Sequence, residues 1–184
     1  MEALVLLASR NSASRVGEPG PDHAAVEAMI SYALRAPDHG RLQPWRFLII
    51  EAESRTRLGE LFAAGLRRRK PEAGNEEMEK NREAPLRAPV VIAVISHIKD
   101  NPKVPAIEQT LSAGCCAYTL LLAAQAMGFG AIWRTGDNCY DPFIQQGLGL
   151  AANEQIVGYV YLGTPLTPAK PLPTLNPVDF MERW

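Results

Sequence analysis

AIEQTLSAGCCAYTLLLAAQAMGFGAIWRTG, at residues 106–136, is the stretch that says most about the fold. Its first part consists mainly of apolar and small side chains without proline, which predicts a buried core helix over residues 106–127. The most apolar part, residues 113–127, contains Gly, Gln and Tyr and is too short to span a bilayer comfortably. Gly128 suits the position after the last helical turn, where φ is positive. A short strand over residues 129–133 is predicted to follow.

Strand and helix patterns alternate on both sides of this stretch. The nearly unbroken β-branched run PVVIAVIS, residues 89–96, predicts a central strand buried on both faces. Residues 45–50 and 155–162 predict two further strands, and residues 54–69 predict a helix. Asp22 is placed to cap another helix through its carboxylate. Because the order has no clean βαβ rhythm, we predict an α+β fold in which helices sandwich a sheet.

Composition limits the classes of protein to which the chain can belong. Its 184 residues suit one domain, over residues 1–184, and 47% hydrophobic residues are enough for a packed core. A net charge of −1 argues against a nucleic-acid binder. The run from Arg67 to Lys70 is interpreted as a solvated helix end; a nucleic-acid module would need a wider basic face.

The three cysteines, Cys115, Cys116 and Cys139, indicate neither a disulfide framework nor a paired metal site. The first residues lack the basic region and cleavage signal of a secretory peptide. We therefore expect a cytoplasmic protein without a metal. P-loop, HExxH, GxSxG and EF-hand motifs do not occur in the sequence.

The first candidate site is RNSASR, residues 10–15, directly after a predicted opening helix. Two guanidiniums and two hydroxyls in six residues can surround a phosphate, because both groups donate hydrogen bonds to its oxygens. The alternative is a solvated helix end, since Arg and Ser are ordinary loop residues.

The second candidate site is the polar loop RAPDHGRLQPW, residues 35–45, between a core helix and a core strand. Pro37 prevents Arg35 and His39 from sharing a regular helix face. A lone histidine is more often structural or solvated than catalytic, and a second histidine is not near in sequence, so a metal site is not expected.

The third candidate site is GFGAIWRTG, residues 128–136. Glycines beside a short strand let the backbone approach a flat ligand closely. The match to a dinucleotide fingerprint is poor, because the third glycine is missing and the glycines follow a helix. The alternative is an ordinary turn between a helix and a strand.

The order of these segments resembles the nitroreductase family. RNSASR resembles the family's RRSxR segment, and RAPDHGRLQPWRF, residues 35–47, resembles its RAPSxxNxQPWxF loop and strand. Residues 104–136 resemble its long central helix, glycine turn and flavin-facing strand. IVGYVYLGTP, residues 156–165, resembles its closing xxGyxxxGxP strand. The resemblance spans nearly the whole chain and is closest to a compact branch of the family.

The resemblance implies a mostly antiparallel central sheet sandwiched by helices, in a homodimer that binds FMN non-covalently at its interface. The phosphate and ribityl chain would be held by Arg10, Asn11 and Ser12. The isoalloxazine or its tail would lie along Trp133, Arg134 and Thr135 of the same subunit. From the partner subunit, Arg35 and His39 would reach the same flavin. The nicotinamide nucleotide is associated in this branch with a stretch that aligns with Ala123, Ala124, Gln125, Ala126, Met127 and Gly128.

The chain departs from the family pattern at three positions. Asn11 stands where a second Arg or a His is usual, and Arg41 stands where many members have the Asn of NxQPW. Thr135 replaces the Glu of larger nitroreductases. These changes affect expected contacts to the phosphate, to the flavin ring and to the nicotinamide or acceptor.

The activity implied is that of an FMN-dependent NAD(P)H oxidoreductase. NADH or NADPH would deliver a hydride to flavin N5, and a nitroaromatic, a quinone or another small acceptor would then take the electrons in a ping-pong cycle. The chemistry would take place on FMN, so no catalytic residue of the protein is expected. The alternative is a flavin-binding protein without turnover, for storage or sensing.

Overall fold

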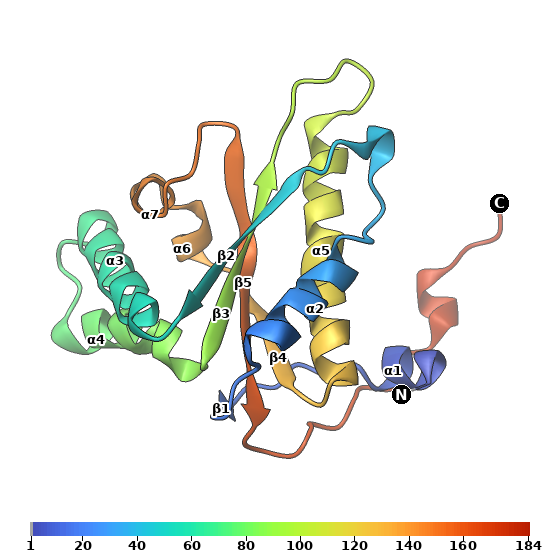
Figure 1. The fold of residues 1–184 in the computed structure, drawn as a ribbon, viewed down its shortest axis with the longest axis horizontal. Coiled ribbons are helices and arrows are strands. Elements are labelled where there is room, and N and C mark those ends of the chain that lie inside the picture. The colour runs from blue at the N-terminus through green and yellow to red at the C-terminus, as the bar shows by residue number, and fades with distance from the viewer. Residues whose placement is uncertain (1) are drawn as a thin grey trace.

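The structure, a computed structural model, describes residues 2–184 and consists of a five-stranded antiparallel sheet with helices on both faces (Figure 1). The sheet order is β1-β5-β3-β2, and β4 also pairs with β5. The strands are β1 (Val16–Gly17), β2 (Trp45–Glu51), β3 (Val90–His97), β4 (Gly130–Arg134) and β5 (Glu154–Pro165). The helices are α1 (Ala3–Ser9), α2 (His23–Ala33), α3 (Glu53–Arg69), α4 (Asn75–Glu83), α5 (Ala106–Ala126), α6 (Asp137–Tyr140) and α7 (Pro142–Gly147). The predicted α+β fold and mostly antiparallel sheet are confirmed.

Strand β3 lies between β2 and β5 and is buried on both faces, as its β-branched run predicts. Val90, Ile92 and Val94 belong to a core with α2 and α5. The alternate side chains of β3, which include Val91 and Ile95, belong to a second core with α3. The period of two in a strand therefore divides one continuous apolar run between two cores.

Helix α5 covers one face of the sheet together with α2 (Figure 1). Ala117, Leu120 and Ala124 are completely buried against the sheet. The helix ends before Gly128, whose φ of 85° confirms the predicted positive-φ position. Asp22 also caps α2 as predicted, because its Oδ1 accepts a hydrogen bond of 2.8 Å from the backbone N–H of Ala25.

The other face of the sheet carries α3, α4, α6 and α7 (Figure 1). Helices α3 and α4 approach closely at Gly59, where an added Cβ would lie 2.0 Å from the carbonyl oxygen of Arg82. Arg69, at the end of α3, forms an ion pair with the buried carboxylate of Asp141 before α7.

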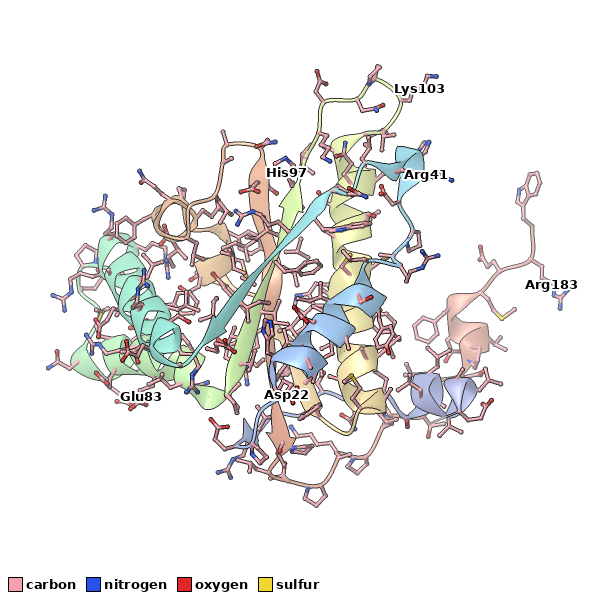
Figure 2. All side chains as sticks on the ribbon, in the orientation of Figure 1. Asp22, Arg41, Glu83, His97, Lys103 and Arg183 are labelled. Atoms are coloured by element: carbon pink, nitrogen blue, oxygen red, sulfur yellow. The ribbon has the colours of Figure 1, made fainter. Side chains whose placement is uncertain are left out.

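The two terminal segments lie apart from these cores. Leu4, Val5 and Leu7 on α1 are exposed. The chain after β5 continues as an extended tail with one 3₁₀ turn, Pro177–Phe180, which the sequence did not predict. Its last residues, near the labelled Arg183, project away from the rest of the molecule (Figure 2). Strand β1 was also not predicted. Among residues 2–184, no helix has the length and apolar character needed to cross a bilayer.

Glu154, at the start of β5, is a buried carboxylate that links β5 to β2, to β3 and to the loop before β5. Arg46 Nε and Nη2 donate to its two oxygens at 2.8 and 2.6 Å, and His97 Nδ1 lies 2.9 Å from Oε1. The backbone N–H of Ala151 donates to Oε2 at 3.0 Å. The hydrogen bonds from Arg46 outweigh desolvation and lower the pKa of Glu154 to about 2.

Acid should therefore destabilise the fold through Glu154. The folded pKa lies below the ordinary value of 4.5, so the contribution is complete above that value and is lost as the pH falls toward 2. Glu154→Gln should cost about 1.5–3 kcal/mol at pH 7, because it removes the charged hydrogen bonds from Arg46, whose side chain is only partly buried. Urea unfolding from pH 7 to pH 3 measures both effects. The exposed Glu182→Gln serves as the control; an unchanged acid dependence in Glu154→Gln would contradict this role.

Candidate functional site

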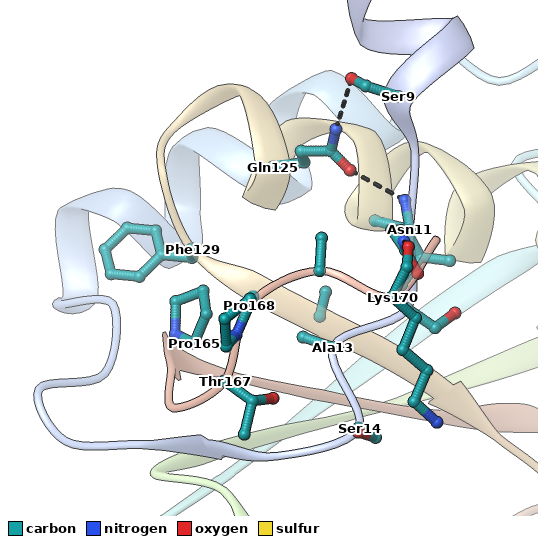
Figure 3. A pocket seen from close by; sticks show the side chains of 15 residues that line it. Ser9, Asn11, Ala13, Ser14, Gln125, Phe129, Pro165, Thr167, Pro168 and Lys170 are labelled. Carbon is teal, nitrogen blue, oxygen red and sulfur yellow. Dashed lines mark hydrogen bonds between the residues drawn. The ribbon is translucent and has the colours of Figure 1, made fainter. Parts of the chain in front are cut away.

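A cavity of about 440 Å³ lies where four segments of the chain meet (Figure 3). The segment between α1 and β1 forms one wall, and the last turns of α5 form another. The start of β4 and the chain after β5 complete it. Its polar lining comes from Ser9, Asn11, Ser12, Ser14, Gln125, Thr167 and Lys170.

Hydrogen bonds hold the segment of residues 10–14 against this cavity. The backbone N–H of Ala13 donates to the carbonyl oxygen of Ala131 on β4 at 2.9 Å. Gln125 of α5 accepts from the backbone N–H of Asn11 at 3.1 Å and donates to Ser9 Oγ at 2.9 Å (Figure 3). The Asn11 side chain donates to the carbonyl oxygen of Lys170 at 2.6 Å. The segment is thus fixed to both α5 and the tail.

The donors around this cavity suit a phosphate. Ser12 and Ser14 contribute hydroxyls, and Lys170 contributes a cation from the tail. Arg10 lies beside the cavity, with Nη1 3.4 Å from Ser12 Oγ. Lys170 was not predicted, because one lysine in a Pro-rich tail has no periodic signal that relates it to residues 10–14.

The three predicted flavin-contacting residues of the third segment follow one another along β4 and just beyond it. The Trp133 side chain lies over β5, with Nε1 donating to the carbonyl oxygen of Val157 at 3.4 Å. Arg134, the next residue, points to the opposite face, where its guanidinium lies 5.5 Å from the Tyr161 ring centroid. Thr135 is exposed, and Gly136 has a φ of 109° that favours glycine.

Gly158→Ala should displace Trp133. An added Cβ would lie 1.9 Å from Trp133 Nε1 and 3.0 Å from the carbonyl oxygen of Arg134. We expect a loss of about 1–3 kcal/mol in the free energy of unfolding, together with changed tryptophan fluorescence. Gly74→Ala is the matched control, because an added Cβ there meets nothing within 4 Å. Equal stability of the two variants would contradict this packing.

The second candidate segment, residues 35–43, borders a separate groove of about 770 Å³ lined in part by Arg35, Arg41 and Gln43. Arg41 and Gln43 have φ angles of 53° and 49°, which are uncommon for residues with side chains. The Asp38 carboxylate stabilises this backbone, because it accepts from the N–H groups of Leu42 and Gln43 at 3.0 and 2.8 Å. Strain of this kind is often found at functional loops.

This loop is attached to the first turns of α5. His39 Nδ1 lies 2.7 Å from a carboxylate oxygen of Glu108, and Ser112 Oγ donates to the carbonyl oxygen of Pro37. Residues 10–14 are instead attached to Gln125, near the other end of α5. From Glu108 to Gln125 the helix rises about 25 Å. One chain therefore does not bring Arg35 and His39 to the cavity beside Arg10, Asn11 and Ser12.

The stretch predicted to contact the nicotinamide nucleotide, residues 123–128, lies at the end of α5 and is partly buried and partly exposed. Ala123 and Ala124 are buried in the core, whereas Ala126 and Met127 are exposed. Gln125 is the member of this stretch that lines the 440 Å³ cavity. A nucleotide role for these residues remains a prediction.

The cysteines and histidines do not suggest another chemistry. In the described part of the chain, no group of three or more metal-ligating side chains is close enough to hold a metal ion. Burial raises the pKa of the Cys116 and Cys139 thiols to about 12, so both stay protonated and are poor nucleophiles.

Comparisons with known proteins give consistent results. The family model described as "Nitroreductase family" matches residues 8–164. "Putative NAD(P)H nitroreductase YdjA" of Escherichia coli is 42% identical over 167 residues, which are 90% of this chain and 89% of that protein. The structure of a nitroreductase-like family protein from Bacillus cereus has a TM-score of 0.86 at 20% identity, covering 100% of this chain and 96% of that one. A nitroreductase with bound FMN from Bacteroides fragilis has a TM-score of 0.74 at 18% identity, covering 100% and 99%.

Proposed function

The chain belongs to the nitroreductase family, in the branch of its YdjA relative, and from this premise we propose that it is an FMN-dependent NAD(P)H oxidoreductase. The name of that relative supports NADH or NADPH as the electron donor. The similar fold of the Bacteroides fragilis protein, which binds FMN, supports the cofactor. The acceptor class proposed is a nitroaromatic, a quinone or another small oxidant.

The observation that carries this proposal is the set of donors around the 440 Å³ cavity. Its volume is in the range of about 300–1,000 Å³ that is usual for small-molecule pockets. Ser12, Ser14 and Lys170 line it, and Arg10 lies beside it. Gly130 lets the segment around Ala13 pack closely against β4, since an added Cβ at residue 130 would lie 2.8 Å from Ala13 Cβ. The hydroxyls and cations among these residues fit a phosphate.

Each part of the proposed site has a distinct task. Arg10, Ser12 and Lys170 would offset and hydrogen-bond the phosphate, whereas Trp133 and Thr135 would position the ring along the exposed edge of β4. FMN, when bound, would supply the redox chemistry, which is hydride transfer from a nicotinamide and electron transfer to the acceptor. The chain itself need not provide an acid or a base.

The distance between the two predicted parts of the flavin site supports a homodimer. Residues 10–12 lie near the end of α5, whereas Arg35 and His39 lie near its start. An exposed apolar stripe on α5, formed by Ile107, Leu111, Cys115 and Tyr118, runs between the two ends at the spacing of one helix face. If two copies pack these stripes antiparallel about a twofold axis, the first turns of one α5 meet the last turns of the other. Arg35 and His39 of each subunit would then reach the flavin held by residues 10–12 and 133–135 of its partner.

The test is an absorbance spectrum of the purified protein, followed by anaerobic titration with NADH and NADPH. A yellow protein that bleaches and recovers its colour with a quinone or nitroaromatic is the expected result. A protein that stays colourless with added FMN contradicts the proposal. A yellow protein that neither nucleotide bleaches would instead be a flavin-binding protein without turnover.

A further inference from the structure

A second, smaller cavity lies on the face of the sheet away from α5. Its volume is about 160 Å³, and its polar lining includes Arg87, Arg134, Asn138, Tyr159 and Tyr161. A neighbouring cavity of about 430 Å³ shares Arg87 and Arg134 and adds Arg15. Three guanidiniums from residues far apart in the sequence therefore gather at one edge of the sheet.

These arginines are not neutralised by the chain. Among residues 2–184, none of the three forms an ion pair with a carboxylate. Four other arginine and lysine side chains do form such pairs. Arg134 Nε is buried and has no hydrogen-bond partner. Stacking on Tyr161 accounts for the position of this guanidinium, but it leaves the Nε–H unsatisfied.

The tyrosines add neutral groups rather than negative charge. Burial raises the pKa of Tyr161 to about 12, although Arg134 and Arg87 act in the opposite direction, so the phenol stays protonated at neutral pH. Burial likewise raises the pKa of Tyr159, whose hydroxyl donates to the carbonyl oxygen of Asn138 at 3.3 Å. The cavity therefore offers positive charge and hydrogen-bond donors with no compensating anion from the protein.

We propose that Arg87 and Arg134 form a binding pocket for a compact oxyanion, of the phosphate or carboxylate class, in this 160 Å³ cavity. The volume is several times that of one water molecule, about 30 Å³. It is below the range of about 300–1,000 Å³ for pockets that enclose larger ligands, so a flavin ring does not fit inside. The planar donor forks of arginine match carboxylate and phosphate oxygens. The pocket uses the Arg134 guanidinium, which lies over Tyr161 on the face opposite Trp133, so anion binding there does not require the proposed redox function.

The test is isothermal titration of the purified protein with inorganic phosphate and with acetate, against chloride at constant ionic strength. Saturable binding of at least one anion, at one site per chain that depends on Arg87, is the expected result. Arg87→Gln should weaken it at least about tenfold, because it removes charged hydrogen bonds. Arg87 is exposed, so this variant is expected to fold, and its circular dichroism checks that it does. Arg134→Gln should have a similar effect.

Arg67→Gln is the matched control, because Arg67 is exposed on α3 and lies outside both cavities. Equal weakening by this control, unchanged affinity in Arg87→Gln, or no binding beyond the chloride reference would overturn the proposal. The FMN-loaded protein identifies the source of the oxyanion. Phosphate that releases flavin fluorescence equally from the unaltered protein and from Arg87→Gln would be bound in the 440 Å³ cavity, which would overturn the proposal. Binding without flavin release that is weakened in Arg87→Gln would support a separate small-anion pocket. Protein that lacks flavin can be titrated in the same way, so failure of the proposed redox function does not affect this test.

Discussion

Arg10→Ala should weaken FMN binding about 10- to 100-fold, because hydrogen bonds to charged groups contribute about 1.5–3 kcal/mol. Arg10 follows the last residue of α1, and its Nη1 lies 3.4 Å from Ser12 Oγ at the edge of the 440 Å³ cavity. The guanidinium is therefore placed to bond a phosphate that the Ser12 hydroxyl also contacts. Flavin retained after gel filtration, and FMN titration followed by fluorescence quenching, measure the loss.

Lys170→Ala tests the same phosphate site from the opposite wall of the cavity. Lys170→Ala should also lower the affinity for FMN. The double variant with Arg10→Ala should bind FMN more weakly than either single variant. Arg67→Ala is the control for removal of an exposed guanidinium. If Arg10→Ala folds normally and keeps the affinity of the unaltered protein, the phosphate does not bind at residues 10–12.

Leu111→Glu should separate the proposed dimer and release its flavin. Leu111 is 62% exposed at the middle of the apolar stripe on α5. A twofold axis that crosses this stripe near its middle would place two introduced carboxylates near each other at an apolar interface, so the dimer dissociation constant should rise at least about a hundredfold. Light scattering gives the oligomeric state, and absorbance gives the flavin content of the same sample.

Tyr140→Glu is the matched control for this variant. Tyr140 is 69% exposed, but it lies on α6 at the other face of the sheet (Figure 1). It should leave both oligomeric state and flavin content unchanged. A Leu111→Glu protein that stays dimeric would argue against the α5 stripe as the interface. A monomer that binds FMN as tightly as before would argue against a site shared between subunits.

Most of the secondary structure could be predicted because its signals are local. The β-branched run of residues 89–96 predicts a strand buried on both faces, and β3 has that environment. Asp22 and Gly128 lie at helix ends where their conformations and hydrogen bonds stabilise the chain, as predicted. Strand β1 and the turn at Pro177–Phe180 were missed, because segments this short have no period to detect.

The candidate site could be predicted only in separate pieces. RNSASR indicated an anion site, but nothing in its neighbourhood pointed to Lys170, whose carbonyl oxygen lies 2.6 Å from Asn11 Nδ2. Gln125 was predicted from family position for a nucleotide, and the structure shows it bonded to the backbone of Asn11. Arg87 had no signal, because its importance comes from sharing a cavity with Arg134.

Residue order alone was enough to predict the family, the α+β class, the main helices and strands, and three segments with suitable chemistry. Those properties depend on residue type and on periods of two or 3.6, which can be read along the chain. The tertiary structure decided which segments meet: Lys170 beside residues 10–14, Arg87 with Arg134, and Arg35 and His39 about 25 Å along α5 from the first cavity. Such meetings depend on how distant strands pair and on which end of α5 each loop is attached to, and neither is specified by any short stretch of residues.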